Sequence, residues 1–312
     1  MKRERNESTS QLPAYLGVST FMRCPESREL KGVDTAVMGV PFDSGATSFR
    51  SGARLGPRKI REASMLLWGF NACLGLAPLD VLNVVDYGDV IVEPASLEET
   101  EMLIHSEARG VLSAGVRLMS LGGDHSVTLP LLRAHREIFG PVAVVHLDAH
   151  VDTEKDRMDH GTVFRHAAEE GLINTEAWVQ VGVRGPISYP EEVEDARDLG
   201  AKVLGMDEIE DTGIPQVIRV IHETIGSHPA YVSLDIDVVD PAYAPGTGTP
   251  EVGGMTSREI LKLVRGLRGL NLVGFDLVEV SPPYDHGDIT SILAANLVFE
   301  FLSLLALESE RR

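Results

Sequence analysis

Cysteine is nearly absent from this sequence, which contains only Cys24 and Cys73 among its 312 residues. Two cysteines so far apart provide no disulfide framework of the kind that stabilises small secreted domains. They also exclude a cysteine-rich structural zinc site. The cysteine content therefore favours the reducing environment of the cytoplasm.

Long apolar runs are missing as well. No apolar stretch approaches the roughly 20 residues that a membrane-spanning helix requires. The first residues, MKRERNESTSQ, lack the apolar segment of a signal peptide, and their acidic residues argue against a transit peptide. We therefore expect a cytoplasmic protein with no membrane partner.

Basic residues are few: the sequence has 28 Lys and Arg residues and 47 Asp and Glu residues, which gives a net charge of −19. This sign opposes binding to nucleic acid or to an anionic membrane, and it favours the attraction of small cations. A surplus of carboxylates can also serve solubility alone. The charge therefore excludes nucleic acid as a partner without identifying another.

The sequence does show a regular alternation of short apolar runs and helix-length amphipathic stretches. The apolar runs are rich in Val, as in parallel strands covered on both faces, and lie at 35–40, 81–85, 116–121, 142–148, 178–183, 202–205, 230–236 and 272–280. The helical patterns span 56–68, 97–114, 126–138, 213–225, 257–267 and 289–307. This alternation predicts one α/β domain with a parallel sheet. We expect residues 1–32 to be a polar lead-in over the surface of a domain formed by 33–312.

The unusual residues lie where the predicted strands end. The segments GGDHS (122–126), DAHVD (148–152), DIDVVDP (235–241) and EVSP (279–282) each follow or end a strand. Function in a parallel sheet gathers in the loops after the carboxyl ends of its strands. In HLDAHVDT (146–153), four polar or ionisable residues alternate, so an extended chain would place them on one face. We therefore expect these segments to meet in a functional site.

Asp235 and Asp237 also lie two residues apart and project to one side. Like charges held together are costly unless a cation or a proton lies between them. Each cluster alone could be solvated loop carboxylates or helix caps, but three clusters at one end of a sheet predict a metal site. Carboxylates outnumber imidazoles and no thiol is present, which favours a hard ion such as Mn²⁺.

The number of candidate ligands points to two ions rather than one. The candidates are His125, Asp148, His150, Asp152, Asp235 and Asp237. Six ligands exceed the need of one open catalytic ion, so two ions with shared carboxylates are the simplest arrangement. Two ions about 3.5–4 Å apart can lower the pKa of a water between them toward about 7. The residues therefore indicate metal-assisted hydrolysis.

The segments GGDHS, DAHVD and SLDIDVVDPAYAPGTGTPEVGG resemble the three signatures of the ureohydrolase family, which comprises arginases, agmatinases and related amidinohydrolases. The similarity continues through DHGTVF and GFDLVEVSPPYDHGDIT and covers about residues 33–307. The resemblance implies a three-layer α/β/α fold with a mostly parallel eight-stranded sheet and two Mn²⁺ ions per chain. It also implies hydrolysis of a guanidino group to an amine and urea by a metal-bridging hydroxide, in a homo-oligomer (trimer or hexamer).

The resemblance also implies roles for individual residues. One ion would be held by His125, Asp148, Asp152 and Asp235, and the other by Asp148, His150, Asp235 and Asp237, with Asp148 and Asp235 bridging. His160, in DHGT, matches the family's loop histidine, an acid/base or proton shuttle whose pKa near neutrality suits that role. Glu279 would anchor the substrate's guanidinium, a planar donor that pairs well with a carboxylate. We also count Asp124 among the candidate catalytic residues, since it could orient its neighbour His125 or another metal ligand from outside the coordination shell. His146 matches no ligand position in the family, which makes it a buried supporting or packing histidine.

The far end of the substrate is less well determined. The loop TEKDRM (153–158) lacks the Ser-Gly-Asn stretch of arginases, and SLGGDHSVTLPLLRAH, VEVSPPYDH and GTGTPEVGG look most like agmatinases. Agmatine's distal ammonium would suit an acidic rim that contains Glu154, Asp156 and Asp159, unless these are solvated loop charges. Arg165, in the pattern GTVFR, favours the alternative of a guanidino acid (guanidinobutyrate, guanidinopropionate or proclavaminate), whose carboxylate needs a cation. We expect agmatine, with guanidino acids as the alternative.

Two functions of a different class stay open at this point. A relative that binds a ligand without catalysis would lack a metal ligand or the pair of His160 and Glu279, and all of these are present. A metal-dependent amide hydrolase of the same general fold would need fewer metal ligands. Release of urea from a guanidino compound distinguishes both from the expected amidinohydrolase.

Overall fold

The computed structural model describes residues 13–44, 48–155 and 158–310. Its described strands form one sheet in the order β2-β1-β3-β8-β7-β4-β5-β6, and every neighbouring pair is parallel. The strands are β1 (Thr35–Gly39), β2 (Val84–Asp89), β3 (Arg117–Leu121), β4 (Val142–Leu147), β5 (Ile173–Val183), β6 (Lys202–Gly205), β7 (Pro229–Asp235) and β8 (Asn271–Val278). The predicted parallel eight-stranded sheet is therefore confirmed.

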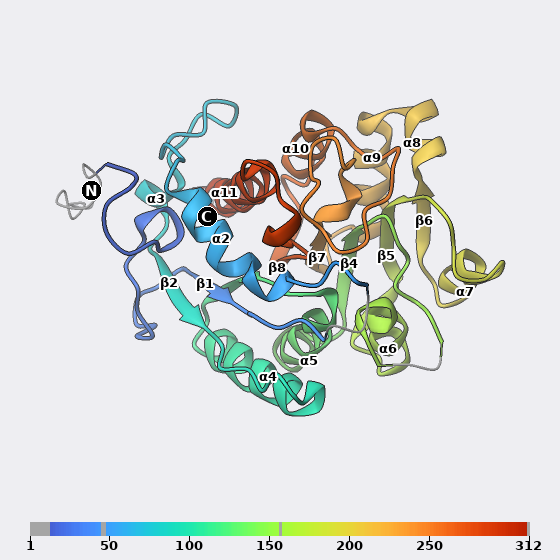
Figure 1. Ribbon diagram of the computed structural model, residues 1–312, viewed down its shortest axis with the longest axis horizontal. Helices are drawn as coiled ribbons and strands as arrows, with labels where there is room; N and C mark the ends of the chain where they lie inside the picture. The colour runs from blue at the N-terminus through green and yellow to red at the C-terminus, as the bar shows by residue number, and fades with distance from the viewer. Residues whose placement is uncertain (1–12, 45–47, 156–157, 311–312) are drawn as a thin grey trace.

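Helices cover both faces of the sheet (Figure 1). One layer contains α2 (Gly56–Ser64), α3 (Pro78–Val81), α8 (Met206–Thr212), α9 (Ile214–Ile225), α10 (Ser257–Gly266) and α11 (Ile289–Ser309). The other contains α4 (Leu97–Ser113), α5 (Thr128–Phe139), α6 (Val163–Glu169) and α7 (Glu192–Asp198). Successive residues of a strand point to opposite faces, so on β4 Val145 packs in the first layer's core and Val144 in the second's. This is the predicted three-layer α/β/α arrangement.

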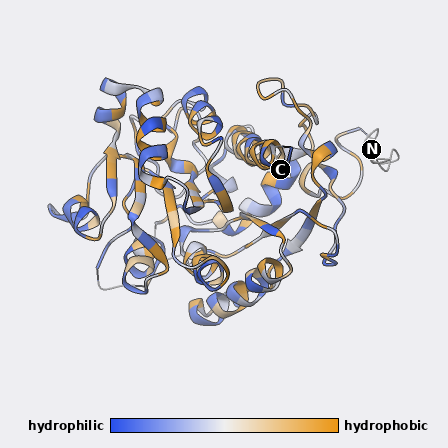
Figure 2. Ribbon diagram, turned by 180° about the vertical axis from the view of Figure 1, so that it is seen from behind, coloured by the Kyte–Doolittle hydropathy of each residue, from blue (hydrophilic) through white to orange (hydrophobic). Residues whose placement is uncertain are grey.

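The apolar run of the last helix is longer than the sequence led us to expect. Among the described helices, α11 is long and apolar enough to cross a membrane by length and composition, but 83% of that window is buried inside the protein. Figure 2 shows its mostly apolar ribbon beside the sheet, and Phe301 stacks on Phe275 of β8 at 3.7 Å between ring centroids. A helix that is apolar all round and buried is a core helix.

Several segments differ from the prediction. β2 begins at Val84 rather than 81, because Pro78 occupies the first turn of α3, which ends at Val81. Helices α6, α7 and α8 were not predicted, since seven residues are too few to show helical periodicity. The lead-in is also not confined to the surface: Phe21 is fully buried, and its backbone N–H donates to Asp86 Oδ2 at 2.7 Å.

His135, a buried histidine outside the predicted ligand set, should affect the stability of the protein in acid. His135 on α5 is buried; its Nδ1–H donates to the carbonyl of Leu131 at 2.7 Å, and its Nε2 has no partner among the described residues. The ring packs edge-on against Tyr231 and fits because residue 274 is Gly, where a Cβ would lie 2.2 Å from Nε2. Burial lowers the pKa of His135 from 6.5 to about 4.

The depressed pKa of His135 predicts a specific loss of stability in acid. Between pH 6.5 and about 4 the unfolded chain binds a proton at His135 that the folded chain does not, so the free energy of unfolding falls as pH falls by up to about 3 kcal/mol. Urea unfolding of metal-free protein from pH 7.5 to 4.5 should therefore show a shallower acid loss for His135→Phe than for the wild type. His105→Gln, at an exposed ion pair with Glu137, is the control, and parallel curves for wild type and His135→Phe would contradict the assignment.

Candidate metal centre and active site

The predicted metal ligands meet at the carboxyl ends of β3, β7 and β4, and the sheet order places β8, which leads to Glu279, between β3 and β7. His125 begins the 3-10 helix η3 (His125–Val127) after β3, and the three ligands of DAHVD follow β4. Asp235 is the last residue of β7, and Asp237 lies in η5 (Ile236–Val238) directly after it. The parallel sheet therefore brings together residues that are more than 100 positions apart in the chain.

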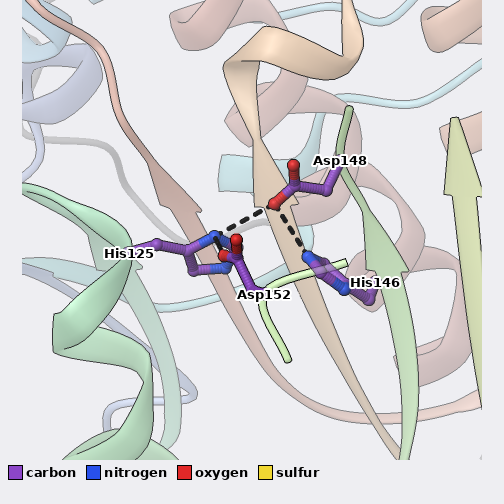
Figure 3. A group of neighbouring side chains, drawn as sticks. All are labelled: His125, His146, Asp148 and Asp152. Carbon is purple, nitrogen blue, oxygen red and sulfur yellow. Dashed lines mark hydrogen bonds and ion pairs between the residues drawn. The ribbon is translucent and has the colours of Figure 1, made fainter. Parts of the chain in front are cut away.

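The first group of ligands surrounds Nδ1 of His125. This atom lies 2.8 Å from Asp152 Oδ2, 3.1 Å from Asp148 Oδ2 and 3.5 Å from Asp235 Oδ2. Figure 3 shows the side chains of Asp148 and Asp152 directed at the His125 ring. The four residues predicted to hold one ion are thus neighbours through their ligand atoms.

The other nitrogen of His125 shows which tautomer the site requires. Nε2 lies 2.9 Å from Ser233 Oγ, and Ser233 donates its single hydroxyl proton to Asp276 Oδ1 at 2.7 Å. Ser233 can therefore only accept from His125, which places the proton of a neutral imidazole on Nε2. The lone pair of Nδ1 then faces three carboxylates, and Nδ1 is buried without a partner in hydrogen-bond geometry among the described residues. A lone pair and three carboxylates around one point fit a bound cation.

The second group of ligands surrounds Nδ1 of His150. This nitrogen lies 3.0 Å from Asp237 Oδ2 and 3.3 Å from Asp148 Oδ1. Asp148 thus turns Oδ2 toward the first group and Oδ1 toward the second. This division of one carboxylate between two groups is what a bridging ligand requires.

The negative charges of the clustered carboxylates are not fully neutralised by other groups of the protein. Burial, followed by the charges of Asp237 and Asp148, raises the pKa of Asp235 well above its usual range. Burial and the charge of Asp148 likewise raise the pKa of Asp237. Burial by itself lowers the pKa of His125, but the carboxylates close to its ring overcome this effect and raise that pKa well above its usual value. The site therefore demands positive charge, which two divalent ions would provide.

His160 and Glu279 lie together beside this cluster. His160 begins the 3-10 helix η4 (His160–Thr162), and its Nδ1 is 2.9 Å from Glu279 Oε1, which also accepts the backbone N–H of His125 at 2.9 Å. Both contacts use Oε1, which leaves Oε2 for a further donor. Burial opposes protonation of His160, but the hydrogen bond and charge of Glu279 raise the pKa of His160 to about 9.

Two residues of the site hold a backbone conformation that L-amino acids rarely adopt. Asp152 has φ of 50° and Glu279 has φ of 63°. Such strain costs of order 1–3 kcal/mol per residue and persists where the surrounding structure enforces it. At Glu279 the enforcement comes from Gly123, whose carbonyl accepts the Glu279 N–H at 2.8 Å and whose Cα packs too closely on Phe42 for any side chain.

Asp124 does not face the cluster. Its carboxylate caps η3 through the backbone N–H of Ser126 at 3.1 Å and binds the backbone N–H of Ser44 at 2.7 Å. It is buried and does not line the cavity described below. The geometry places Asp124 as a support of the His125 backbone, and a direct catalytic contact has no geometric basis.

A cavity of about 740 Å³ opens over the cluster. Its described lining includes Asp152, Asp235, His150 and His160 at the metal end. Glu154, Lys155, Asp159, Ser188, Tyr189, Glu192 and Thr249 also line it. The predicted Asp156 lies outside the described residues. A substrate bound at the metals would therefore extend past these side chains.

The sequence did not predict the far wall of the cavity. Ser188 donates its hydroxyl to Glu154 Oε1 at 2.5 Å and its backbone N–H to Glu192 Oε2 at 2.6 Å. Burial, followed by the charge of Glu154, raises the pKa of Glu192. Lys155 pairs with Asp195 at 2.5 Å. Glu154 and Glu192 thus have no cationic partner among the described residues, whereas the ammonium of Lys155 already has an anionic one.

Arg165 does not line the cavity among the described residues. Its Nε donates to the carbonyls of Thr153 and Glu154, at 2.8 and 3.1 Å, and its guanidinium also approaches Glu169 and Asp195. Arg165 thus holds the loop that follows Asp152. This placement gives a substrate carboxylate no direct access to Arg165 in the structure.

Other functional candidates were missed although the sequence carried a signal for some. Asp276 is the single charge in the apolar strand β8, and it accepts hydrogen bonds from Ser233, Thr128 and Tyr231. Gln180 is likewise the single polar side chain in the apolar half of β5. A lone polar residue in a buried strand must find a partner, so both could have been singled out as supports of the site.

The chain is similar to known proteins over nearly its full length. A model of the Arginase family matches residues 33–303. Proclavaminate amidinohydrolase of Streptomyces clavuligerus is 46% identical over 93% of this chain and 94% of that protein. A solved structure of that enzyme covers 95% of this chain and 99% of its own, with 45% identity and a TM-score of 0.90. Guanidinobutyrase of Pseudomonas aeruginosa is 43% identical over 95% of each chain. Agmatinase of Chromobacterium violaceum is 44% identical over 93% of this chain and 89% of that protein.

Proposed function

The chain belongs to the arginase family of hydrolases that act on C–N bonds of linear amidines, and we propose that it is a binuclear manganese enzyme that hydrolyses agmatine to putrescine and urea. The observation that carries the binuclear assignment is the division of Asp148 between the His125 group and the His150 group. The proposed ligands are His125, Asp148, Asp152 and Asp235 for one ion and Asp148, His150, Asp235 and Asp237 for the other.

The protein's own residues would bind and protonate the substrate. Two bound Mn²⁺ ions would make hydroxide available at neutral pH. Glu279 is held in place through Oε1 and would pair with the guanidinium through Oε2. With a pKa of about 9, His160 is protonated at neutral pH. Because its Nδ1–H is engaged by Glu279, its Nε2–H is the proton that can pass to the leaving amine.

The far wall of the cavity supports agmatine over a guanidino acid. Glu154 and Glu192 would attract the distal ammonium of agmatine, whereas they would repel a carboxylate. Lys155 is the one Lys or Arg among the described residues that line the cavity, and it is paired with Asp195. Arg165, the cation that favoured guanidino acids, is not among the described residues that line the cavity, and its Nε donates to backbone carbonyls.

A guanidino acid is the second candidate, because relatives that are similarly close to this chain carry such names. Proclavaminate amidinohydrolase and guanidinobutyrase are 46% and 43% identical to it, and the agmatinase is 44% identical. Overall identity therefore does not favour one substrate class. For a guanidino acid to bind, Lys155 would have to leave Asp195 for the substrate carboxylate.

A urea-release assay with Mn²⁺ tests the proposal on agmatine, 4-guanidinobutyrate, 3-guanidinopropionate, arginine and guanidine. We expect the highest kcat/KM for agmatine. Glu154→Gln and Glu192→Gln should each lower kcat/KM for agmatine about 10- to 100-fold, the value of a hydrogen bond to a charged group, with little change for 4-guanidinobutyrate. The matched variant Lys155→Met should leave kcat/KM for agmatine unchanged.

The same assay decides between the candidates. Highest activity on 4-guanidinobutyrate, lost in Lys155→Met, would replace agmatine with a guanidino acid. No urea from any of the five compounds would refute the proposed hydrolase. The homo-oligomer is proposed from family membership alone, and light scattering measures it directly.

A further inference from the structure

His146 is a buried histidine in the cluster that the proposed ligand set does not use. It lies on β4, fully buried, stacked on Phe164 at 3.9 Å between centroids. Its Nε2 is 2.8 Å from Asp148 Oδ2. Its ligand atoms are close enough to those of His125, Asp148 and Asp152 for all four residues to hold one ion (Figure 3). His146 is therefore either an additional metal ligand or a support for Asp148.

The partner of its other ring nitrogen decides between these roles. Gln180 is the residue paired with His146 on the neighbouring strand β5. Its Nε2 lies 2.7 Å from the carbonyl of Val151 and 3.1 Å from Nδ1 of His146. A carbonyl only accepts hydrogen bonds, so the Val151 contact fixes the orientation of the Gln180 amide. The second amide proton of Gln180 then points at His146, whose Nδ1 must accept it.

Acceptance at Nδ1 fixes the state of the whole ring. A neutral histidine that accepts at Nδ1 carries its proton on Nε2, and that proton is directed at Asp148 Oδ2. Both ring nitrogens are thereby used, so His146 has no lone pair left for a metal ion. A series of hydrogen bonds therefore leads from Gln180 on a buried strand, through His146, to Asp148, whose carboxylate faces both ligand groups.

We propose that Gln180 and His146 are positioning residues that hold the bridging carboxylate of Asp148 for the two metal ions. This inference rests on the proposed binuclear site. The backbone N–H of His150 donates to Asp148 Oδ1 at 2.6 Å, so each carboxylate oxygen is held by one donor and keeps a lone pair for a metal. Gln180 also fixes the carbonyl of Val151, which lies in the chain between the ligands His150 and Asp152. A single amide thus orients one ligand and the loop that carries two others.

Manganese titration of metal-depleted protein tests this hydrogen-bond relay from Gln180 through His146 to Asp148 without relying on activity. His146→Phe keeps a ring on Phe164 but loses the donor to Asp148, so we expect Mn²⁺ dissociation constants to rise about 10- to 100-fold, the usual effect of removing an outer partner. Two ions should still bind at saturation. His146→Gln retains a donor at the position of Nε2 and should recover most of the affinity.

A double-variant cycle tests whether Gln180 acts through His146. Gln180→Leu should also weaken Mn²⁺ binding, through His146 and through Val151. If the relay exists, Gln180→Leu combined with His146→Phe should lose less binding free energy than the two single variants added together. Strict additivity would show that Gln180 acts only on the loop and would overturn the relay.

The matched control is His135→Phe, because His135 is also a buried histidine packed against aromatic rings but lies outside the cluster. Its Mn²⁺ constants should equal those of the wild type, and thermal melts of the metal-free variants identify any that fail to fold. Unchanged affinity in His146→Phe would make His146 a packing residue, and saturation at one ion would make it a ligand. A wild type that binds no Mn²⁺ would instead refute the proposed binuclear site itself.

Discussion

Replacement of Asp235 by alanine should abolish urea release and reduce bound manganese below two ions per chain. Asp235 Oδ2 lies 3.5 Å from Nδ1 of His125, and its Oδ1 accepts the N–H of Asp237 at 2.8 Å. One substitution therefore removes a proposed ligand of both ions and also releases the loop that carries Asp237. The loss of kcat should exceed the roughly 10- to 100-fold typical of residues that only support ligands. Elemental analysis of the purified variant and a urea assay measure both effects.

In the metal-free protein, the same substitution should not lower thermal stability. Burial and the charges of Asp237 and Asp148 raise the pKa of Asp235 well above its usual range, so without metal this residue destabilises the fold when ionised. Metal-free Asp235→Ala should therefore melt at or above the temperature of the metal-free wild type. Mn²⁺ at a hundred times its Kd should stabilise the wild type by about 2.7 kcal/mol per site, and much of that increment should vanish in the variant.

Asp240→Ala is the matched control because Asp240 is a carboxylate of the same segment outside the cluster. It accepts the backbone N–H groups of Ala242, Gly253 and Gly254, as expected for turn chemistry. Asp240→Ala should cost stability but leave two ions bound. Two retained Mn²⁺ ions and near-normal turnover in Asp235→Ala would contradict the bridging assignment.

The convergence of the proposed metal ligands could be predicted from sequence because it follows a simple physical rule. Parallel strands end at the same edge of a sheet, and alternation places Asp148 and His150, or Asp235 and Asp237, on one side of the chain as it leaves a strand. Local pattern and fold class together bring these segments to one place. The resemblance then separated His146 from the proposed ligands, and in the structure both nitrogens of its ring have hydrogen-bond partners.

The supports of the ligands were not predictable in the same way. Gln180 meets His146, and Asp276 meets Ser233, only because β5 pairs with β4 and β8 with β7. Strand order in a parallel sheet depends on how the connecting helices cross over, and no short segment of the sequence contains that information. A lone polar residue in an apolar strand shows that a partner exists, but it does not show which one.

The residues of the far wall of the cavity were even harder to predict from the sequence. Ser188 and Glu192 belong to the loop after β5 and to the short helix α7, where no motif or periodicity marks them. Arg165 illustrates the converse: its local pattern suggested a substrate contact, whereas the fold turns its guanidinium to the carbonyls of Thr153 and Glu154. Long side chains can reach several partners, so sequence position alone does not tell where their charge lies.

Glu279→Gln should separate substrate binding from metal binding. The amide keeps an oxygen that can accept from the backbone of His125 and from His160 Nδ1, as Glu279 Oε1 does at 2.9 Å in both cases. It replaces Oε2 with an NH₂ group, a donor that would face the donors of the guanidinium. Loss of a buried charge partner typically costs 2–5 kcal/mol, so kcat/KM should fall roughly 30- to 5,000-fold. Elemental analysis should still find the wild-type content of two Mn²⁺ ions.

Glu300→Gln is the control for the loss of a buried carboxylate, because Glu300 is buried to a similar extent and pairs with Arg265 and Asn71 far from the site. It should retain wild-type kcat/KM at some cost in stability. If Glu279→Gln loses manganese together with activity, Glu279 acts through the backbone of His125 and its role as guanidinium anchor is wrong. If kcat/KM is unchanged with metals in place, the guanidinium binds elsewhere. Only loss of substrate affinity with both ions retained fits a carboxylate that uses one oxygen to hold the site and the other to bind the substrate.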